Sequence, residues 1–502
     1  MASPAGRSAA SGSSPATTVD AAVIGAGLAG LVTARSLHRA GCSVLVLEAR
    51  DRVGGRTLNV EVTPGVQAEI GGQWVGPGQG RVLALVDELG LETFPTHDHG
   101  RHLLEHEGRM RPYRGDVPRV GPAGLVDLQI ALWRLTWMAR SVPPDAPWTA
   151  PRAAAWDEQT VASWIRRHVR TRFARAMLTA MCEAVWAADP ADLSLLHLLA
   201  YSRSGGGLER LISTRDGAQQ RRIVGGSQRI ALTLAAELGD RVRLDAPVRA
   251  IGVAPADRRP VTTGGATADA PPGDTVVTVS TDTERITARR VVVAMSPTLA
   301  GRITYDPPLP ARRDQLTQRV PQGSVIKAMA VYPRPFWRDR DLSGQVVSTT
   351  GPVKVVFDNS PPDGTPGILV GFFEGSQARE AGRLSPEDRR AAMLACLTRF
   401  FGPDAASPIG YVERDWSAEE WSRGCYGAFL PPGTWTALGD ALRAPVGPIH
   451  WAGSETSPVG MGYMDGAVAS GDAAARAVLA GLGGPAPARP SNAAGHPEEQ
   501  TP

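Results

Sequence analysis

The sequence predicts an α/β (α+β) fold that is divided between two domains. Three observations lead to this prediction. The chain has 502 residues, which exceeds what one hydrophobic core usually serves. A buried strand, a helix and a second buried strand follow one another near the N-terminus, as in a βαβ unit. Farther along the chain, a helical region and several half-buried strands occupy separate blocks.

The predicted βαβ unit consists of strands at residues 20–25 and 42–48 and a helix at residues 28–40. Its first turn reads Gly25-Ala-Gly-Leu-Ala-Gly30. Glycines at this spacing allow a tight turn, a close approach of a pyrophosphate and tight packing of the helix on the strand. Glu48 ends the second strand, where a carboxylate can accept hydrogen bonds from ribose hydroxyls. The unit predicts a Rossmann-like dinucleotide-binding fold, and it does not choose between FAD and NAD.

The remaining elements follow from periodicity and turn residues. Residues 149–201 are rich in Ala, Leu, Trp and Arg at helical spacing and predict a helical insertion. Residues 241–248 and 275–280 alternate like half-buried strands, residues 290–294 form a buried strand, and residues 254–274 predict a hairpin loop. Residues 1–18 and 484–502 are rich in small and polar residues, and we expect a disordered leader and tail.

Composition excludes several classes of protein. The hydrophobic fraction of 42% and the charged fraction of 21% are ordinary for a soluble protein. A net charge of +3 without a long basic run gives no case for nucleic acid, and no apolar run is long enough for a membrane span. The chain has four widely spaced cysteines and no CxxC pair: Cys42, Cys182, Cys396 and Cys425. We therefore expect a soluble, cytoplasmic protein without a disulfide framework or a metal site.

A glycine-rich turn with three arginines follows Glu48, because residues 49–57 read ARDRVGGRT. Arginine forks match phosphate oxygens, and Gly54-Gly55 lets backbone amides approach a cofactor closely. Such a turn on its own would be a basic surface loop. Its position directly after the βαβ unit favours a role in cofactor binding.

Four sequence blocks carry a resemblance to a known family. They read LEARDRVGGR at residues 47–56, GGQWVGP at 71–77, AGSET at 452–456 and GYMDGA at 462–467. These blocks resemble the signatures of the flavin-containing monoamine oxidase family, and the resemblance runs from about residue 20 to residue 482. Two further blocks, VPQGSVIK at 320–327 and WSRGCY at 421–426, resemble monoamine oxidases more closely than other members.

The resemblance implies an amine oxidase fold with FAD in a discontinuous domain at residues 19–93, 224–298 and 419–482. It implies an inserted substrate domain of mixed sheet and helices at residues 94–223 and 299–418. A helix from Gly466 would direct its positive N-terminal end toward the flavin. The partners implied are a small-molecule amine and O2, and a homodimer stays open. The residues that match cofactor contacts of the family are Gly25, Gly27, Leu28, Ala29, Gly30, Glu48, Ala49, Arg50, Gly55, Arg56, Gly72, Gln73, Trp74, Val248, Cys425, Gly453, Glu455, Tyr463 and Met464.

Cys425 matches the position at which mitochondrial monoamine oxidases attach the 8α-methyl group of FAD through sulfur. A covalent thioether and a small buried thiol both stay open, because the environment of the thiol decides its reactivity.

Three residues match catalytic positions of the family: Lys327, Tyr426 and Tyr463. Lys327 lies in an apolar strand pattern, where a lysine is unusual unless it has a partner. The resemblance implies that it bonds through a water to flavin N5 and assists reoxidation by O2, whereas an edge-strand lysine is the plainer interpretation. Tyr426 and Tyr463 match two facing aromatics that orient an amine before the flavin.

The substrate cavity is expected to include Tyr426 and Tyr463 together with Ala184, Val185, Ile212 and Gln219. Ala184 and Val185 are small and leave room for a bulky or aromatic side chain. The predicted function is the oxidative deamination of a primary, arylalkyl amine: FAD takes a hydride equivalent from Cα, and O2 becomes H2O2. The imine that forms hydrolyses to an aldehyde and ammonia.

Several rival functions stay open at this point. A putrescine or polyamine oxidase would need an acid for the distal ammonium, for which Glu209 is a candidate. An L-amino-acid oxidase would need an arginine for the carboxylate, for which Arg210 or Arg215 could serve. A biosynthetic amine oxidase fits the same residues. A non-catalytic FAD-binding interaction module is a rival of another class, and the presence of Lys327 and both tyrosines argues against it.

Overall fold

The computed structural model describes residues 17–115, 118, 120–255 and 275–483. In these residues one sheet has eight strands in the order β10-β2-β1-β13-β12-β11-β14, with β20 paired to β13. These strands are β1 (Thr17–Ile24), β2 (Val44–Leu47), β10 (Val242–Arg243), β11 (Val248–Pro255), β12 (Thr275–Thr281), β13 (Arg285–Ala294), β14 (Thr304–Asp306) and β20 (Ile449–Ala452). We call this the nucleotide sheet; β1, β2, β10, β13 and β20 form its parallel part.

The nucleotide sheet is buried on both faces because β1 is apolar at consecutive positions. Ala21 and Val23 pack into one core cluster, and Ala22 and Ile24 pack into another, as the alternation of side chains across a strand requires. The first cluster also contains side chains of four helices: α1 (Leu28–Arg39), α2 (Gly80–Glu88), α9 (Gln228–Leu238) and α15 (Met464–Leu482). A parallel sheet covered in this way leaves the carboxyl ends of its strands as the place for a ligand.

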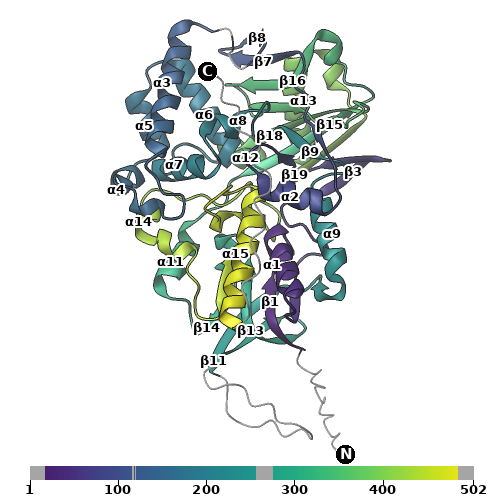
Figure 1. The fold of residues 1–502 in the computed structure, drawn as a ribbon. Helices are drawn as coiled ribbons and strands as arrows, with labels where there is room; N and C mark the ends of the chain where they lie inside the picture. Colours follow the sequence, from purple (N-terminus) through teal and green to yellow (C-terminus); the bar gives the residue numbers. More distant parts are fainter. Residues whose placement is uncertain (1–16, 116–117, 119, 256–274, 484–502) are drawn as a thin grey trace, which may run out of the picture.

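Helix α15 packs directly on α1, and a glycine makes this approach possible. A Cβ atom at Gly471 would lie 2.5 Å from the carbonyl oxygen of Ala29. The hydroxyl of Thr33 donates to the Gly471 carbonyl oxygen at 3.1 Å. Figure 1 shows α1 and α15 side by side over the lower sheet, so the first and the last helix of the described chain belong to one layer.

A second sheet, which we call the substrate sheet, has seven strands in the described residues, in the order β19-β15-β18-β17-β16-β7-β8. The strands are β7 (Arg101–His106), β8 (Arg109–Tyr113), β15 (Val325–Tyr332), β16 (Leu342–Ser348), β17 (Val355–Asp358), β18 (Gly367–Glu374) and β19 (Gly410–Asp415). Every residue of β15 and β18 is buried. Ile326, Ala328 and Ala330 face one core cluster, whereas Val325, Met329 and Val331 face another.

The other strands and the helices connect the two sheets. The small strands are β3 (Asn59–Thr63), β4 (Val66–Glu69), β5 (Trp74–Val75), β6 (Thr93–Pro95) and β9 (Arg221–Ile223). The remaining α-helices are α3 (Pro122–Ala139), α4 (Ala153–Asp157), α5 (Val161–His168), α6 (Arg172–Trp186), α7 (Leu195–Ser204), α8 (Leu208–Ile212), α10 (Pro297–Ala300), α11 (Ala311–Arg319), α12 (Ser376–Ala381), α13 (Pro386–Phe401) and α14 (Thr434–Leu438). In Figure 1 the group α3 to α7 lies beside the two sheets.

The predicted helical insertion at residues 149–201 is confirmed by α4, α5, α6 and α7. Three of these helices begin at a hydroxyl residue whose side chain accepts the backbone N–H three residues later: Thr160, Thr171 and Ser194. Such caps satisfy an otherwise unpaired N–H and explain why the helices begin there.

Three sequence-based boundaries differ from the structure. The predicted leader reached residue 18, but β1 begins at Thr17, where pairing with β13 adds to the sheet. The predicted strand 241–248 is divided into β10 and β11 by the turn at Asp245, which has a positive φ of 53°. Helix α15 begins at Met464, before Gly466. The remaining leader, the tail and the centre of the hairpin loop lie outside the described residues.

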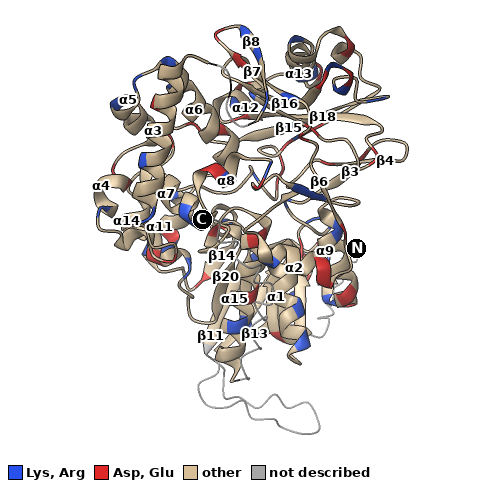
Figure 2. Ribbon diagram, turned by 45° about the horizontal axis from the view of Figure 1, so that its top comes forward, with Lys and Arg blue, Asp and Glu red and all other residues tan. Residues whose placement is uncertain are grey.

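We propose that the two sheets correspond to the two domains expected from the sequence. One strand departs from the expected limits, because β14 pairs with β11 of the nucleotide sheet although residues 299–418 were assigned to the other domain. Figure 2 shows acidic and basic residues interspersed over both parts. Within the described part of the chain, none of the helices combines the length and apolar character that a membrane span requires.

Candidate active site

A single cavity of about 1020 Å³ extends from the nucleotide sheet to the substrate sheet. One end is lined by the turn after β1, by Glu48 and by Val248. The other end, which we call the chamber, is lined by Lys327, Phe372 and the two tyrosines of the predicted cage. The cavity is larger than most sites for a small ligand, so it has room for an extended cofactor together with a substrate.

The three glycines of the first turn have different structural roles. A Cβ atom at Gly25 would lie 2.8 Å from the Ala294 carbonyl oxygen, and one at Gly30 would lie 1.9 Å from the Gly25 carbonyl oxygen. These two glycines therefore permit close packing of α1 against the sheet. A Cβ atom at Gly27 would meet nothing within 4 Å. Gly27 lines the cavity and Gly30 packs α1 against the first turn, and the expected contact of Gly30 with the cofactor stays a prediction.

Glu48 and Arg50 form a buried charge pair at the nucleotide end. Glu48 accepts from the Ala26 backbone N–H at 2.7 Å and from the Arg50 guanidinium at 3.1 Å. Arg50 also donates to Glu419 at 3.2 Å and to Ser422 at 2.8 Å. All three guanidinium nitrogens of Arg50 thus have protein partners. The carboxylate of Glu48 keeps capacity to accept a further bond, because an ionised carboxylate has about four acceptor sites.

Arg56 and Glu455 form a second charge pair, which lies beside the chamber. The guanidinium of Arg56 donates to the two carboxylate oxygens of Glu455 at 2.6 and 3.0 Å and to the Tyr426 carbonyl oxygen at 2.9 Å. Burial alone would raise the pKa of Glu455, but the Arg56 guanidinium lowers it below its ordinary value. Glu455 holds Arg56 in place through these bonds, and its expected contact with the cofactor stays a prediction.

Cys425 lies in the cavity wall between Arg56 and the chamber, and it is buried. Its backbone N–H donates to the Gly323 carbonyl oxygen at 3.0 Å, which fixes its position. Burial raises the pKa of the Cys425 thiol to about 12, and the nearby Arg56 lowers it by a smaller amount. The thiol lines the cavity, and its surroundings by themselves favour the protonated form.

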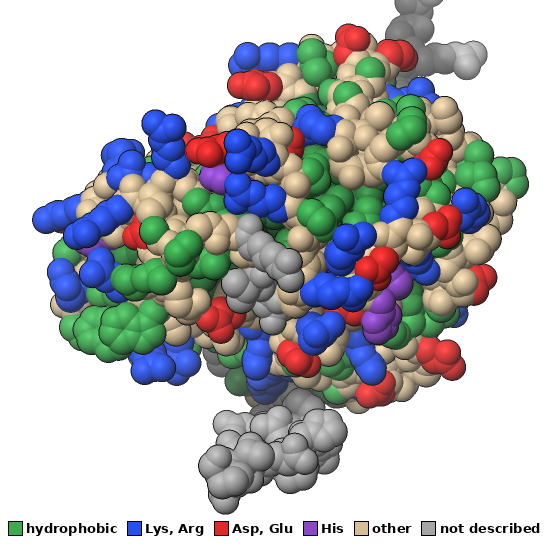
Figure 3. All heavy atoms as spheres, turned by 90° about the horizontal axis from the view of Figure 1, so that it is seen from above, with side chains coloured by type: hydrophobic (Ala, Val, Ile, Leu, Met, Phe, Trp, Pro, Cys, Tyr) green, Lys and Arg blue, Asp and Glu red, His purple; other side chains and the backbone are tan. Residues whose placement is uncertain are grey.

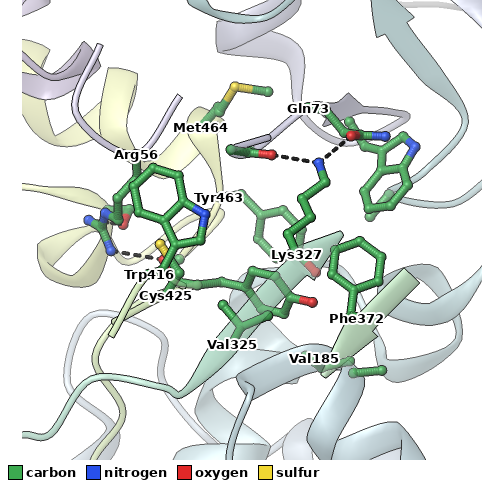
Figure 4. Close-up of a pocket in the computed structure, with 18 of the residues that line it drawn as sticks. Arg56, Gln73, Val185, Val325, Lys327, Phe372, Trp416, Cys425, Tyr463 and Met464 are labelled. Atoms are coloured by element: carbon green, nitrogen blue, oxygen red, sulfur yellow. Dashed lines mark hydrogen bonds between the residues drawn. The ribbon is translucent and has the colours of Figure 1, made fainter. Parts of the chain in front are cut away.

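Lys327 lies at the junction between the two ends of the cavity. Its ammonium donates to the Gly71 carbonyl oxygen at 2.8 Å and to the side-chain oxygen of Gln73 (Figure 4). Gln73 is itself fixed by a 2.6 Å bond to Asn359. Burial lowers the pKa of Lys327 to about 7, although nearby Glu69 acts in the opposite direction. An ammonium has three donors, so one stays available toward the cavity. Lys327 is 4% exposed and lies on central β15, which rules out the edge-strand interpretation.

The two tyrosines of the predicted cage both line the chamber, and each has a polar or aromatic support. The hydroxyl of Tyr426 donates to Glu374 at 2.7 Å. The ring of Tyr463 lies 5.9 Å from the ring of Tyr201. Phe372 lies 6.2 Å from the ring of Tyr426, nearly perpendicular to it. The chamber therefore has aromatic walls, and contacts with neighbouring side chains hold these rings in their orientation.

The other predicted cavity residues also lie in the wall. Val185 lines the chamber (Figure 4), and Ala184 precedes it on α6. Gln219 and Ile212 line the outer part, where Ile212 is 43% exposed. Helix α3 contributes Leu125 and Leu128 to the wall and also carries exposed Trp133 and Trp137. On the face in Figure 3, apolar side chains lie among arginines and lysines.

Three residues proposed for rival substrates are not placed for that purpose. Glu209 and Arg210 are exposed and lie outside the cavity wall, because α8 directs them outward. Arg215 lines the outer part of the cavity, but it is largely exposed and pairs with Asp98 at 3.2 Å.

Sequence reasoning missed four residues that line the chamber: Tyr201, Gln322, Phe372 and Glu374. Tyr201 lies on an apolar helix among similar residues, and Gln322 lies in a loop before β15. Phe372 and Glu374 alternate on β18, and only the pairing of β18 with β15 reveals which face meets the cavity. No local pattern could have identified them.

The residues present fit FAD. Gly27 and Gly55 form an open cradle, since a Cβ atom at Gly55 would lie 3.4 Å from the Gly27 Cα atom. The N-terminus of α1 has no side-chain cap, and its first residues, Leu28 and Ala29, line the cavity. Unpaired N–H groups at a helix start suit a pyrophosphate. Trp74 lies at the junction, and its buried indole nitrogen has no hydrogen-bond partner within the described residues.

Comparison with known proteins agrees with this site. The family of flavin containing amine oxidoreductases matches residues 28–479. A Mycobacterium tuberculosis protein named flavin-containing monoamine oxidase AofH is 44% identical over 466 residues, which cover 93% of this chain and 98% of that protein. An L-amino acid dehydrogenase of Synechocystis is 36% identical over 476 residues, covering 93% and 96%. The solved structure of wild-type putrescine oxidase bound to putrescine has a TM-score of 0.86 at 35% identity, and the match covers 93% of this chain and 100% of that one.

Family, cavity and fold agree on the cofactor, which is FAD, and on the reaction class, which is oxidation of an amine. The expected amine oxidase fold is confirmed, since the match with putrescine oxidase spans both sheets. The chain belongs to the family of flavin-containing amine oxidoreductases.

Proposed function

We propose that the protein oxidises a primary arylalkyl amine with O2 and releases an aldehyde, ammonia and H2O2. The observation that carries this proposal is the continuity of the cavity. A cradle for a dinucleotide passes, at Lys327, into a chamber walled by Tyr426, Tyr463 and Phe372. FAD, when bound, supplies the two-electron chemistry that the amino acid side chains lack. The name of the mycobacterial relative supports a monoamine as substrate.

The atoms balance as follows in the proposed reaction. An amine R-CH2-NH2 loses two electrons and two protons and becomes an imine, while O2 gains them and becomes H2O2. Water then adds to the imine, and an aldehyde and ammonia leave. The buried chamber supports this order, because a dry site protects the amine and the reduced cofactor from side reactions.

We propose distinct roles for the side chains of the chamber. Tyr426 and Tyr463 orient the amine, since electron-rich rings attract a cationic or lone-pair-bearing nitrogen and leave few orientations for its Cα–H bond. Lys327 holds a proton at the junction and stabilises negative charge that develops on oxygen during reoxidation. Phe372 and Val185 provide apolar surface for an aromatic side chain.

We propose that the cofactor lies along the wall from the first turn to the junction. The backbone of Gly25 to Ala29 holds the pyrophosphate, Glu48 and Ala49 hold the ribose, and Val248 contacts the adenine. Gly55, Arg56, Gly72, Gln73, Trp74, Gly453 and Met464 line the path toward the ring end. Cys425 is near enough to this path to form a thioether, and we treat that bond as a separate proposal.

Two rival substrate classes follow from the names of similar proteins, which include a putrescine oxidase and an L-amino acid dehydrogenase. Glu209 and Arg210 are exposed and Arg215 pairs with Asp98, so none of these three residues anchors a rival substrate in the chamber. Peroxide release by purified holoenzyme should therefore be fastest with phenylethylamine, and slower with 1,4-diaminobutane and with phenylalanine. Faster release with either of the latter would contradict the proposed substrate, and no release with any amine would contradict catalysis.

A further inference from the structure

Glu374 is a buried acid in the chamber wall. It is the last residue of β18 and lies opposite Val325 of β15, whereas Phe372 lies opposite Lys327. Alternate residues of a strand share a face, so Phe372 and Glu374 face the cavity together, and both line it. Two residues along a strand span about 7 Å. Glu374 therefore lies one step farther along the chamber than the row that contains Lys327.

The carboxyl group of Glu374 is held at one oxygen and unpaired at the other. Oε1 accepts the hydroxyl of Tyr426 at 2.7 Å. Oε2 is buried and has no hydrogen-bond partner in the part of the chain that the structure describes. Buried polar atoms in native proteins nearly always have a partner, either in the protein or in a ligand or water. Because Tyr426 fixes the first oxygen, the second oxygen has a defined position.

A second residue of the same cavity has the same property. Gln322 lines the cavity, and both polar atoms of its side chain are buried without a partner among the described residues. Leaving a buried donor or acceptor unpaired is unfavourable. A substrate with a polar group against these atoms would remove part of that cost, whereas a wholly apolar side chain would not.

The charges near Glu374 indicate which polar group would fit. Burial raises the pKa of Glu374 to about 8, nearby Glu183 acts in the same direction, and the bond from Tyr426 and the charge of Lys354 act against it. Lys354 is engaged with Glu183 at 2.6 Å. A neutral carboxyl can donate from Oε2, and an ionised one can only accept. A hydroxyl group suits both forms, because it donates and accepts, whereas a second ammonium suits only the ionised form.

We propose that Glu374 is a specificity-determining residue of the chamber, which binds a hydroxyl group on the side chain of the amine. This inference rests on the proposed amine oxidation and specifies its substrate as a hydroxylated arylalkyl amine. The amine nitrogen lies between the cage tyrosines, the aromatic ring contacts Phe372 and Val185, and the hydroxyl reaches Oε2 of Glu374.

The test compares 4-hydroxyphenylethylamine with phenylethylamine, which differ only in that hydroxyl. We expect wild-type holoenzyme to favour the hydroxylated amine by about tenfold in kcat/KM, as one buried hydrogen bond would give. Glu374→Leu should abolish the preference, and Glu374→Gln, which keeps a donor and an acceptor, should retain part of it. Glu380→Leu is the matched control, because Glu380 is exposed on α12 and its replacement should leave the preference intact.

A binding measurement supplies a readout that does not depend on turnover. Calorimetry should show that 4-ethylphenol binds wild-type holoenzyme about tenfold more tightly than ethylbenzene, and that Glu374→Leu binds both equally. Equal kcat/KM for the two amines in the wild type, or an undiminished preference in Glu374→Leu, would overturn the inference. Selective loss of 1,4-diaminobutane oxidation in Glu374→Leu would overturn it as well, in favour of a second ammonium. Peroxide from phenylethylamine in every variant would show that the proposed function holds in any of these cases.

Discussion

The two ends of the cavity differ in the ionisation of their buried side chains. From the nucleotide end to the border of the chamber, ionised groups are closed into pairs: Glu48 with Arg50, Arg50 with Glu419, and Arg56 with Glu455. In the chamber, the titratable groups have pKa values shifted toward the neutral form by burial: Lys327 is lowered, and Glu374 and Tyr426 are raised. One end holds fixed charges and a fixed shape, and the other keeps groups whose protonation can respond to a substrate.

The largest expected effect tests the fixed shape of the nucleotide end. Gly30→Ala places a Cβ atom at the Gly25 carbonyl oxygen, so α1 must move away from the sheet. We expect this variant to lose its bound FAD almost completely and to unfold at lower temperature than the wild type. The visible flavin absorbance of the purified protein and its thermal unfolding check both effects.

Gly27→Ala is the matched comparison, because its Cβ atom would meet no protein atom and its φ of −74° suits alanine. It should keep the unfolding temperature of the cofactor-free protein and bind FAD more weakly. If Gly30→Ala binds FAD as well as Gly27→Ala does, the distinction between packing and contact glycines is wrong.

The second-largest expected effect tests the buried charge pairs. Glu455→Gln leaves the Arg56 guanidinium partly buried without its counter-charge, which should lower the free energy of unfolding by about 3 kcal/mol. Because the folded protein lowers the pKa of Glu455 below 4.5, the contribution of this pair is present above about pH 4.5 and is lost as the pH falls. Urea unfolding at several pH values measures this, and a variant with unchanged stability above pH 5 would contradict it.

Substitutions of the two cage tyrosines test the proposed role of the chamber. Tyr426→Ala and Tyr463→Ala should each lower amine oxidation by about tenfold or more while FAD stays bound, since misorientation removes the reactive geometry. Steady-state kinetics with a parallel flavin spectrum checks this. Tyr426→Phe should retain more activity than Tyr426→Ala, because the ring stays and only the bond to Glu374 is lost. Unchanged kinetics in both alanine variants would mean that these tyrosines only fill space.

The same comparison explains which parts of the site could be predicted. The nucleotide end depends on contiguous residues from Gly25 to Gly30 and on Glu48, so a local pattern identifies it. The chamber depends on side chains from strands that meet only in the folded sheet, as Lys327 and Phe372 do. Both faces of β18 are buried, so its sequence does not indicate which residues face the cavity.

The partners of the predicted residues could not be predicted either. The nitrogens of Arg50 bond to residues more than 360 positions away as well as to Glu48. Arg56 bonds to Glu455 and to the Tyr426 carbonyl oxygen, which are also far away in the sequence. The expected contacts of both arginines with the cofactor stay predictions. The chemistry of a guanidinium is evident from its sequence position, but its nearest acceptor depends on the tertiary fold.

The smallest expected effect concerns the Cys425 thiol, which lies in the cavity wall between Arg56 and the chamber. If Cys425 forms a thioether, acid precipitation should leave the yellow colour with the wild-type polypeptide, and Cys425→Ala should release it. Turnover of Cys425→Ala with bound FAD should change by less than about tenfold, since FAD supplies the redox chemistry whether or not it is attached. Free FAD in the wild-type supernatant would rule out the thioether and leave the fold unaffected.

The central claim is that Lys327, at the junction, serves the oxygen half of an amine oxidation. Stopped-flow mixing can follow reduction by phenylethylamine without O2, and then the return of the oxidised flavin absorbance when O2 is added. The test belongs below pH 7, where the Lys327 side chain is charged, because its pKa is about 7. Lys327→Met, which is similar in length, should reduce at nearly the wild-type rate and reoxidise about 100-fold more slowly, as expected for loss of one positioned charge. Equal slowing of both halves, or reoxidation at the wild-type rate, would contradict the claim.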